Sequence, residues 1–371
     1  MIYKYLYIDD ESGGVTTSML DGFNDKNIIS IIPLKLNRGD DFNIVWDNII
    51  TKYSENSFNG IIFDLCLDGE GENSLKVKAP PLAQQIRSLA SEGSVPHMPI
   101  VLCSTKDKKV YFDKDRASHD LFDHYFNKDD NPSIQAPLLK SLSEGYDVLN
   151  KQSDSDYISH VLNRDPEDCI DNRFVGYISG VDLSPSDIAH RLMFGIINQS
   201  GVLITEDIVA SRMGVDVEAS GEAWKRLLSD IKTVALYKGV FSSGWTRLWA
   251  DRVGDFFMSN SDKQPYHLLT ARERVDVLVR AGYDGLIPAK PLRFNNSTFF
   301  NTVCYQSRKP LDALEGIPIG DSMSLMPWQE NDFISIYSIA HGDFPESSLC
   351  NEGKKKYNEL KLYVMDGDKG E

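Results

Sequence analysis

The stretch YLYIDD at residues 5–10 decides how the first part of this chain folds. Its apolar residues, Tyr5 to Ile8, stop at two adjacent carboxylates, Asp9 and Asp10. Continuous apolar runs of this length are typical of strands that are buried on both faces of a parallel sheet. Comparable runs follow at residues 28–34, 60–65, 99–103 and 122–126.

Segments with helical periodicity lie between these runs. The apolar residues of 42–50, 82–89 and 138–149 recur every three or four positions, which is typical of amphipathic helices. Strands joined through helices are parallel, because each connection must cross over the sheet. We therefore predict a doubly wound, five-stranded parallel α/β sheet of the flavodoxin type in residues 1–153.

Polar residues stand where the predicted strands end. Asp9 and Asp10 end the first, Asp64 the third, Ser104 the fourth and Lys128 the fifth. In an open α/β sheet these carboxyl ends form the ligand crevice. Crowded carboxylates repel one another unless a cation is present, and oxygen ligands of this kind favour Mg²⁺. A nearby hydroxyl and ammonium suit an anion, so the pattern predicts a site that moves a phosphoryl group onto or off a carboxylate.

The segments that carry these residues resemble the receiver domain of two-component response regulators. They read YLYIDDES, GIIFDLCLDG, PIVLCST and HYFNKDD, in that order along the chain. That family has an acidic pair after the first strand and a phospho-acceptor aspartate after the third. A Ser or Thr and a Lys follow its fourth and fifth strands. The resemblance covers residues 1–153, about two-fifths of the chain.

The resemblance implies a metal site and a phospho-acceptor. Asp64 would accept the phosphoryl group. Asp9 and Asp10 would be the acidic pair that binds Mg²⁺. Asp64 and the backbone carbonyl of Cys66 would be further ligands of the same ion.

The resemblance also implies a switch. Lys128 would pair with the phosphoryl group, Ser104 would be the switch hydroxyl, and Tyr125 the switch aromatic. Two neighbours depart from the family pattern: Thr105 stands where Ala or Gly is common, and Asp129 where Pro is usual. The loop GEGENSLKVKAPP after the third strand is also longer, so a degenerate receiver that no longer turns over phosphate stays open.

Each of these residues has a plain structural interpretation as well. Asp9 and Asp10 could end a strand or cap a helix, and Asp64 could begin a loop. Lys128 lies in the polar run NKDDNPS, which suits a turn. Tyr125 suits a core aromatic.

A polar stretch without periodicity, residues 152–156, predicts a boundary between domains at 1–153 and 154–371. The second domain is expected to be mostly α-helical (α+β), with a subdivision near residue 283. Trp245 and Trp249 at helical spacing indicate a core face of one helix. Helices are expected at residues 185–201, 205–213, 220–235, 245–257 and 270–279, and short strands at 299–305 and 333–337.

Residues 205–231 have the helix, glycine turn and helix of a helix-turn-helix. The second helix would carry Glu218, Glu222 and Asp230 against only two basic residues. The whole chain holds 39 Lys and Arg against 55 Asp and Glu, and this net charge of −16 opposes binding to nucleic acid and to anionic membranes. We therefore expect a structural helix pair here.

The compartment is inferred from the cysteines and from the hydropathy of the chain. The 5 cysteines are scattered without a CxxC pair, so neither a disulfide framework nor a zinc site is supported. The first residues lack the layout of a signal peptide, and no apolar run approaches the roughly 18 residues of a membrane span. A cytoplasmic protein is expected.

Three functions are compatible with this sequence. The first is a response-regulator-like signalling protein, phosphorylated on Asp64 by a histidine kinase or a small phospho-donor and acting on a downstream protein partner. Receivers often dimerise through their last strand and helix, so a homodimer is compatible with the resemblance, although the sequence does not set the oligomeric state. The second is a degenerate receiver serving as a constitutive adaptor. The third is a receiver-gated effector, either an enzyme or a DNA-binding regulator, although the chain carries no recognised enzyme motif.

Overall fold

The structure is a computed structural model. It describes residues 2–9, 14–25, 27–37, 39–65, 67, 77–105, 120–151, 156–168, 171–180, 182–320 and 322–367. Contacts between residues divide the chain into two compact units. The first unit comprises Met1–Asp168, Gly176–Met193 and Lys238–Trp245, and the second unit comprises Cys169–Val175, Phe194–Tyr237 and Thr246–Glu371.

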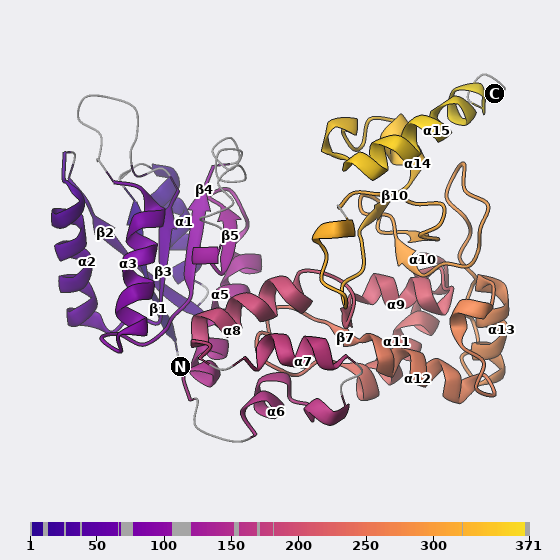
Figure 1. The fold of residues 1–371 in the computed structure, drawn as a ribbon, viewed down its shortest axis with the longest axis horizontal. Helices are drawn as coiled ribbons and strands as arrows, with labels where there is room; N and C mark the ends of the chain where they lie inside the picture. The colour runs from indigo at the N-terminus through magenta and orange to yellow at the C-terminus, as the bar shows by residue number, and fades with distance from the viewer. Residues whose placement is uncertain are drawn as a thin grey trace. The chain divides into compact units, whose positions relative to one another are not determined.

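The first unit contains a five-stranded parallel sheet of order β2-β1-β3-β4-β5 (Figure 1). This confirms the predicted fold class, and each strand lies within two residues of its predicted start. The burial of β1, β3 and β4 explains why their sequences are continuous apolar runs. The strands are β1 (Tyr3–Asp9), β2 (Ile29–Lys35), β3 (Gly60–Asp64), β4 (Ile100–Ser104) and β5 (His124–Asn127).

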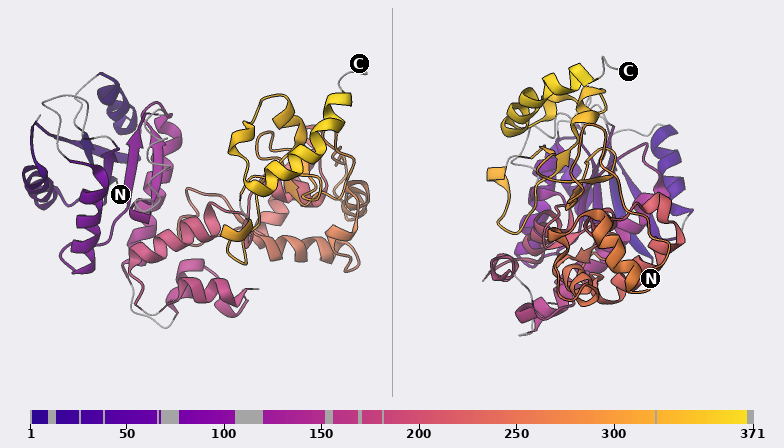
Figure 2. Two further views of the ribbon diagram at one scale, coloured as in Figure 1. Left: turned by 45° about the horizontal axis from the view of Figure 1, so that its top comes forward. Right: turned by 90° about the vertical axis from the view of Figure 1, so that its right-hand side faces the viewer.

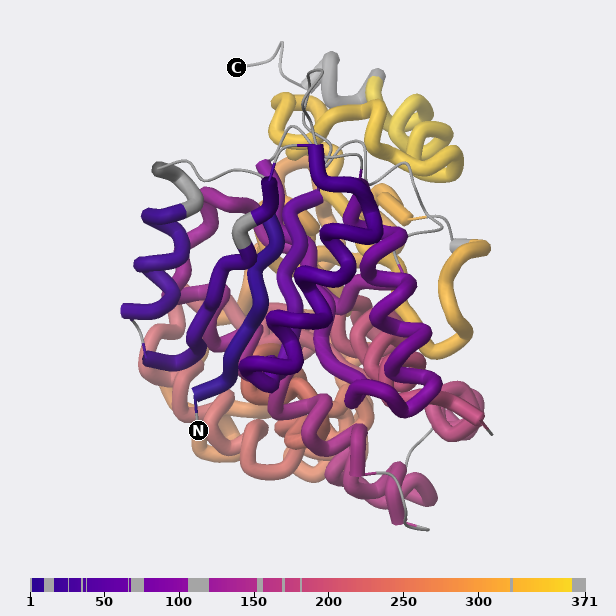
Figure 3. The backbone as a smooth tube through the Cα atoms, turned by 90° about the vertical axis from the view of Figure 1, so that its left-hand side faces the viewer, coloured from indigo at the N-terminus to yellow at the C-terminus, as the bar shows by residue number. Residues whose placement is uncertain are grey.

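Helices cover both faces of this sheet. The helices α1 (Gly14–Asn24) and α5 (Pro132–Leu149) lie on one face, and α2 (Phe42–Asn56) and α3 (Ala79–Ser91) lie on the other (Figure 3). The predicted helix between β4 and β5 falls on residues 106–119, outside the described residues.

Successive side chains of β1 point to opposite faces of the sheet. Leu6 belongs to a buried cluster that also holds Ile49 of α2 and Leu82 of α3. Tyr5 points to the opposite face and donates its hydroxyl to the Leu139 carbonyl of α5 at 2.6 Å. Because successive side chains of a strand point to opposite faces, one apolar run supplies two cores.

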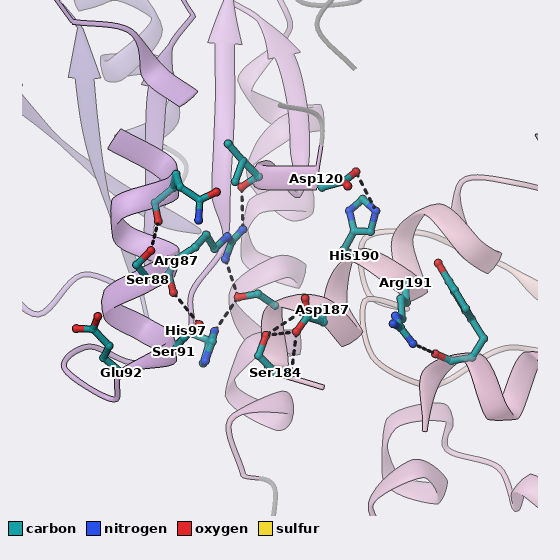
Figure 4. Close-up of a pocket in the computed structure, with 14 residues that line it drawn as sticks. Arg87, Ser88, Ser91, Glu92, His97, Asp120, Ser184, Asp187, His190 and Arg191 are labelled. Carbon is teal, nitrogen blue, oxygen red and sulfur yellow. Dashed lines mark hydrogen bonds and ion pairs between the residues drawn. The ribbon is translucent and has the colours of Figure 1, made fainter. Parts of the chain in front are cut away.

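A buried polar cluster joins the starts of β4 and β5 to later helices of the first unit. Arg87 donates to Asp123 Oδ2 at 2.8 Å, to Ser186 Oγ at 2.9 Å and to the Tyr146 hydroxyl at 3.2 Å. Tyr146 in turn donates to Asp123 Oδ1 at 2.8 Å. The cluster borders a polar cavity of about 780 Å³, in which His97 Nδ1 lies 2.8 Å from Ser186 Oγ (Figure 4). Ser186 is on α8, so these bonds hold α8 in the first unit.

Replacing Tyr146 by phenylalanine is expected to destabilise the protein by about 1–3 kcal/mol, because Asp123 loses a donor in a buried place. The free energy of urea unfolding, followed by circular dichroism, measures this. Tyr53→Phe is the matched control, because the Tyr53 hydroxyl has no hydrogen bond to a described residue. Equal stability of the two variants would contradict the prediction.

The first unit also takes in a segment far along the chain. Ser141 of α5 donates to the Phe241 carbonyl at 3.0 Å and accepts from the Gly244 amide at 2.9 Å. Gly145 of α5 faces the Phe241 ring, where a Cβ atom would lie 2.2 Å from a ring carbon. The first unit therefore differs from the predicted domain 1–153: it continues to Asp168 and includes two later segments.

The second unit is mostly helical, as predicted (Figure 2). No helix among the described residues is long and apolar enough to cross a membrane. The helices after β5 and α5 are α6 (Tyr157–Leu162), η2 (Pro166–Asp168), α7 (Asn172–Ile178), α8 (Pro185–Leu192), η3 (Met193–Ile197), α9 (Glu206–Met213), α10 (Val217–Ser220), α11 (Glu222–Ala235), α12 (Ala250–Asn260), η4 (Tyr266–Leu268), α13 (Ala271–Arg280), η5 (Ser322–Ser324), α14 (Ile336–Ala340), η6 (Glu346–Ser348) and α15 (Asn351–Gly367). The short strands form antiparallel pairs: β6 (Leu203–Ile204) with β7 (Leu248–Trp249), β8 (Thr302–Val303) with β9 (Pro310–Leu311), and β10 (Ile317–Pro318) with β11 (Phe333–Ile334).

Three predicted elements of this region are wrong in part. The helix expected from residue 245 begins at Ala250, because Leu248 and Trp249 pair with β6, so Trp245 and Trp249 do not share a helix face. Ser220 ends α10, and α11 begins after Gly221, whose φ of 48° interrupts the helix. The second expected strand covers only β11 and is followed by α14, which the sequence did not indicate.

The helix pair at residues 205–231 packs into one core. Val209 of α9 and Leu227 of α11 are both fully buried in the same cluster. Gly214 ends α9 with a φ of 72°, as its position after the last apolar residue predicted. These observations fit the structural interpretation of the pair.

A buried arginine ties together several segments of the second unit. Arg274 of α13 is fully buried, and burial lowers its pKa to about 10. Its guanidinium donates to the carbonyls of Leu269 at 2.8 Å, Arg212 at 3.1 Å and Ser211 at 3.3 Å. It also donates to the Phe300 carbonyl. Among the described residues no carboxylate forms an ion pair with this charge, and backbone oxygens from three places in the chain accept from its Nε and Nη1.

Candidate functional site

Two aspartates meet at the carboxyl edge of the sheet. Strand β1 pairs with β3 so that Ile8 lies beside Phe63. Asp9 and Asp64 are the next residues along these strands and are only 6% and 1% exposed. Carboxyl ends of neighbouring parallel strands meet at one edge, which is why the two side chains lie together.

Lys128 joins the two carboxylates. It follows β5 directly, and its backbone amide donates to the Ser104 carbonyl at 2.9 Å. Its ammonium lies 3.0 Å from Asp9 Oδ2 and 3.4 Å from Asp64 Oδ1. Asp129, which stands where the receiver family has proline, therefore does not keep Lys128 away from the carboxylates.

Tyr7 is a further member of the site that the sequence reasoning missed. Its hydroxyl donates to Asp9 Oδ2 at 2.6 Å. Burial, followed by the nearby Cys103 and Asp9, raises the pKa of Tyr7 far above its usual value, so the hydroxyl remains a donor. The signal was present: Tyr7 precedes Asp9 by two residues, and residues two apart on a strand share a face.

Ser104 offers a hydroxyl at the same edge. It is the last residue of β4 and is fully buried. Its Oγ has no hydrogen-bond partner among the residues that the structure describes. A buried hydroxyl without a partner is costly, so this position favours a bound group that brings an acceptor oxygen.

Tyr125 belongs to a set of hydrogen bonds in β5 and the turn after it. Its hydroxyl donates to Asn127 Oδ1 at 3.0 Å, and the Asn127 amide donates to Asp130 Oδ2 at 2.8 Å. Gln135 Nε2 lies 3.4 Å from the same Asp130 oxygen, and Gln135 Oε1 lies 3.1 Å from His124 Nε2. The predicted switch aromatic is thus bonded into the turn that carries Lys128.

Protonation of His124 should weaken the first unit, because burial lowers the pKa of His124 below its usual value. The pKa of histidine in the unfolded chain is about 6.5. When the pKa in the folded state is lower, the histidine stabilises the fold above about pH 6.5, and this stabilisation is lost as the pH falls. Between about pH 7.5 and 5.5 the free energy of unfolding should fall less in His124→Gln than in wild type, by up to about 1.4 kcal/mol, because only about one pH unit of this window lies below the unfolded pKa. Urea unfolding at both pH values tests this, and identical pH dependence would refute it.

The remaining predicted metal ligands, Asp10 and the Cys66 carbonyl, lie outside the described residues. Within the described residues no group of three or more His, Cys, Asp or Glu side chains could hold a metal ion. Asp9 and Asp64 nevertheless supply two buried carboxylates against one ammonium. This excess negative charge and all-oxygen donor set fit Mg²⁺, which takes few protein ligands and keeps several waters.

Comparison with known proteins gives no match to a family model and none to a curated protein. Two solved structures are similar to part of the chain. One is the Saccharomyces cerevisiae co-crystal structure of the histidine phosphotransfer signalling protein Ypd1 and the receiver domain of its downstream response regulator Ssk1, with 17% identity over 38% of this chain and 89% of that chain and a TM-score of 0.28. The other is the Vibrio cholerae chemotaxis protein CheY4, with 13% identity over 38% of this chain and 99% of that chain and a TM-score of 0.26.

The strand topology of the first unit identifies its fold. Its five parallel strands follow the order β2-β1-β3-β4-β5, and helices cover both faces. Of the predicted site residues, Asp9, Asp64 and Ser104 end β1, β3 and β4, and Lys128 directly follows β5. The first unit therefore has a receiver-like fold, and the C-terminal half is unidentified.

Proposed function

We propose that the first unit is a phosphorylation switch of the response-regulator type, with Asp64 as the phospho-acceptor. The observation that carries this proposal is the Lys128 ammonium, which contacts Asp9 and Asp64 together at the edge of the sheet. A lysine that contacts two buried carboxylates can form a new ion pair with a phosphoryl group that is attached to one of them. The buried Ser104 hydroxyl supports the proposal, because it lies on the strand beside Asp64.

The proposed reaction is a phosphoryl transfer to a carboxylate. An Asp64 oxygen attacks the phosphorus of a phosphohistidine or of a small acyl phosphate. The new O–P bond forms as the bond from phosphorus to the donor nitrogen or oxygen breaks, and the donor keeps that electron pair. Lys128 and Ser104 would bind the oxygens of the transferred group. Later attack of water on phosphorus would break the bond between phosphorus and the Asp64 oxygen, releasing inorganic phosphate and restoring the carboxylate.

Magnesium has a defined place in this proposal. Asp9, Asp10, Asp64 and the Cys66 carbonyl would hold the ion, which when bound offsets the negative charge of the phosphoryl oxygens. Tyr7 would keep Asp9 oriented through its hydrogen bond. A protein partner, rather than nucleic acid, is the proposed target of the output, because the chain is strongly acidic.

Intact-mass spectrometry of the full chain tests the proposal. The protein is treated with acetyl phosphate or phosphoramidate, with Mg²⁺ or with EDTA. One phosphoryl adduct that needs Mg²⁺ and maps to the peptide containing Asp64 is expected. No adduct from a folded protein with either donor would favour the alternative, a receiver-shaped adaptor that acts only through its partners.

A further inference from the structure

The surface formed by α5 and β5 is occupied by a segment from far along the same chain. This output segment, Lys238–Trp245, belongs to the first unit. Its Phe241 carbonyl and Gly244 amide both bond to Ser141 Oγ, at 3.0 and 2.9 Å. The Phe241 ring occupies the space that Gly145 leaves by lacking a side chain.

The output segment also contacts β5. The ring of Trp245 meets the ring of His124 edge to face, with centroids 5.8 Å apart and planes at 83°. The rings of Phe241 and Trp245 are themselves 6.4 Å apart. His124 precedes the predicted switch aromatic, Tyr125, by one residue, so the segment contacts the strand that leads into the site.

Hydrogen bonds connect this contact to the site. His124 bonds to Gln135, Gln135 to Asp130, and Asp130 to the backbone amide of Asn127. Asn127 accepts the Tyr125 hydroxyl. The next residue is Lys128, whose ammonium contacts Asp9 and Asp64. The turn is therefore held at one end by the site and at the other end by the output segment.

The output segment carries backbone strain that its docking maintains. Phe241 has a φ of 68°, a left-handed conformation that is rare for a bulky residue. Strained residues persist only where the surroundings hold them, and here both Ser141 and Gly145 do so. A loss of these contacts would let Phe241 relax.

We propose that the output segment responds to phosphorylation of Asp64 in the same chain. It docks on α5 and β5 while Lys128 contacts both carboxylates, and it leaves when Asp64 carries a phosphoryl group. The inference rests on the proposed function. A phosphoryl group adds strong negative charge beside Lys128 and competes with Asp9 for its ammonium. Movement of Lys128 would shift the bonded turn and loosen the contact between His124 and Trp245.

Hydrogen exchange of the full chain tests this directly. Amide exchange in residues 240–245 is measured with and without acetyl phosphate and Mg²⁺, and the adduct fraction is measured by intact mass in the same samples. Exchange there should rise at least about tenfold in the phosphorylated protein, while α9 should not change. Unchanged or slower exchange at full adduct would overturn this inference and leave the proposed function intact. Absence of the adduct would overturn both.

A pair of matched variants tests whether weakening the contacts of the output segment changes the affinity of the phosphorylation site. Ser141 and Ser143 are both buried on α5, but Ser143 bonds to Tyr5 and not to the output segment. Coupling between two sites is reciprocal in binding free energy. Beryllofluoride with Mg²⁺, a phosphoryl mimic, should therefore bind about 3–10-fold more tightly to Ser141→Ala than to wild type, with no such gain in Ser143→Ala.

Calorimetric titration measures these affinities. If Ser141→Ala does not fold, Trp245→Ala removes the contact with His124 instead, and Trp245→Phe keeps a ring in place as its control. Equal affinity in Ser141→Ala and Ser143→Ala, or in Trp245→Ala and Trp245→Phe, would overturn the proposal.

Discussion

Asp64→Asn is expected to lower the amount of phosphoryl adduct by at least about 100-fold, because an amide oxygen is a far poorer nucleophile than a carboxylate. Asparagine keeps the shape of the side chain, so the loss would not come from repacking. The variant is also expected to unfold at a urea concentration no lower than wild type. One of two carboxylates facing a single ammonium is then gone, and Asp9 keeps Lys128 as its partner.

Intact-mass spectrometry after treatment with acetyl phosphate and Mg²⁺ measures the adduct. Asp147→Asn is the matched control. Asp147 is on α5, accepts a hydrogen bond from the Tyr3 hydroxyl at 2.8 Å and is remote in sequence from every predicted site residue. The control should be phosphorylated like wild type. An adduct that persists in Asp64→Asn would show that another residue accepts the phosphoryl group.

Arg274→Met is expected to destabilise the second unit by about 3–5 kcal/mol, because several backbone carbonyls lose a charged donor in a fully buried place. Hydrogen bonds to a charged group contribute about 1.5–3 kcal/mol each, and methionine restores the volume but none of the bonds. The carbonyls of Leu269, Arg212 and Phe300 would be left to find other partners.

Urea unfolding followed by tryptophan fluorescence measures this effect. Arg272→Met on the same helix is the control, since Arg272 is exposed and its replacement should change stability by less than about 0.5 kcal/mol. Phosphorylation of Asp64 should proceed in Arg274→Met as long as the first unit remains folded. Similar stabilities of the two variants would show that the carbonyls do not depend on Arg274.

The fold of the first unit could be predicted because its signals are local. The run from Tyr5 to Ile8 is buried on both faces, so its apolar composition alone identified a strand. The predicted site followed from the same logic, since Asp9, Asp64 and Lys128 each stand where a strand ends. Their mutual distances then follow from the parallel order of the strands.

Other members of the site could not be predicted, because their roles depend on side-chain orientation. Gln135 and Asp130 read as ordinary polar residues of a turn and a helix start. Only the folded chain shows that they bond to each other and to neighbours of Tyr125. Asp10 and the Cys66 carbonyl stay predictions.

The second unit was harder to predict, because many of its elements are defined by distant partners. A two-residue strand such as Leu248–Trp249 has no periodicity of its own and forms by pairing with Leu203–Ile204. Trp245 matched a helical stripe by spacing, but it packs against His124 more than a hundred residues earlier. Arg274 lay inside a correctly predicted helix, yet nothing in its sequence neighbours marked it as buried.

The discontinuous first unit has a consequence for synthesis on the ribosome. Proteins fold as they emerge, from the N-terminal end onward. All five strands of the sheet are made by residue 127, but Gly145 and Ser141 do not meet Phe241 and Gly244 until more than a hundred further residues have been translated. A nascent chain therefore displays an open α5 surface throughout that interval, when chaperones and other nascent chains compete for it before the cognate segment arrives.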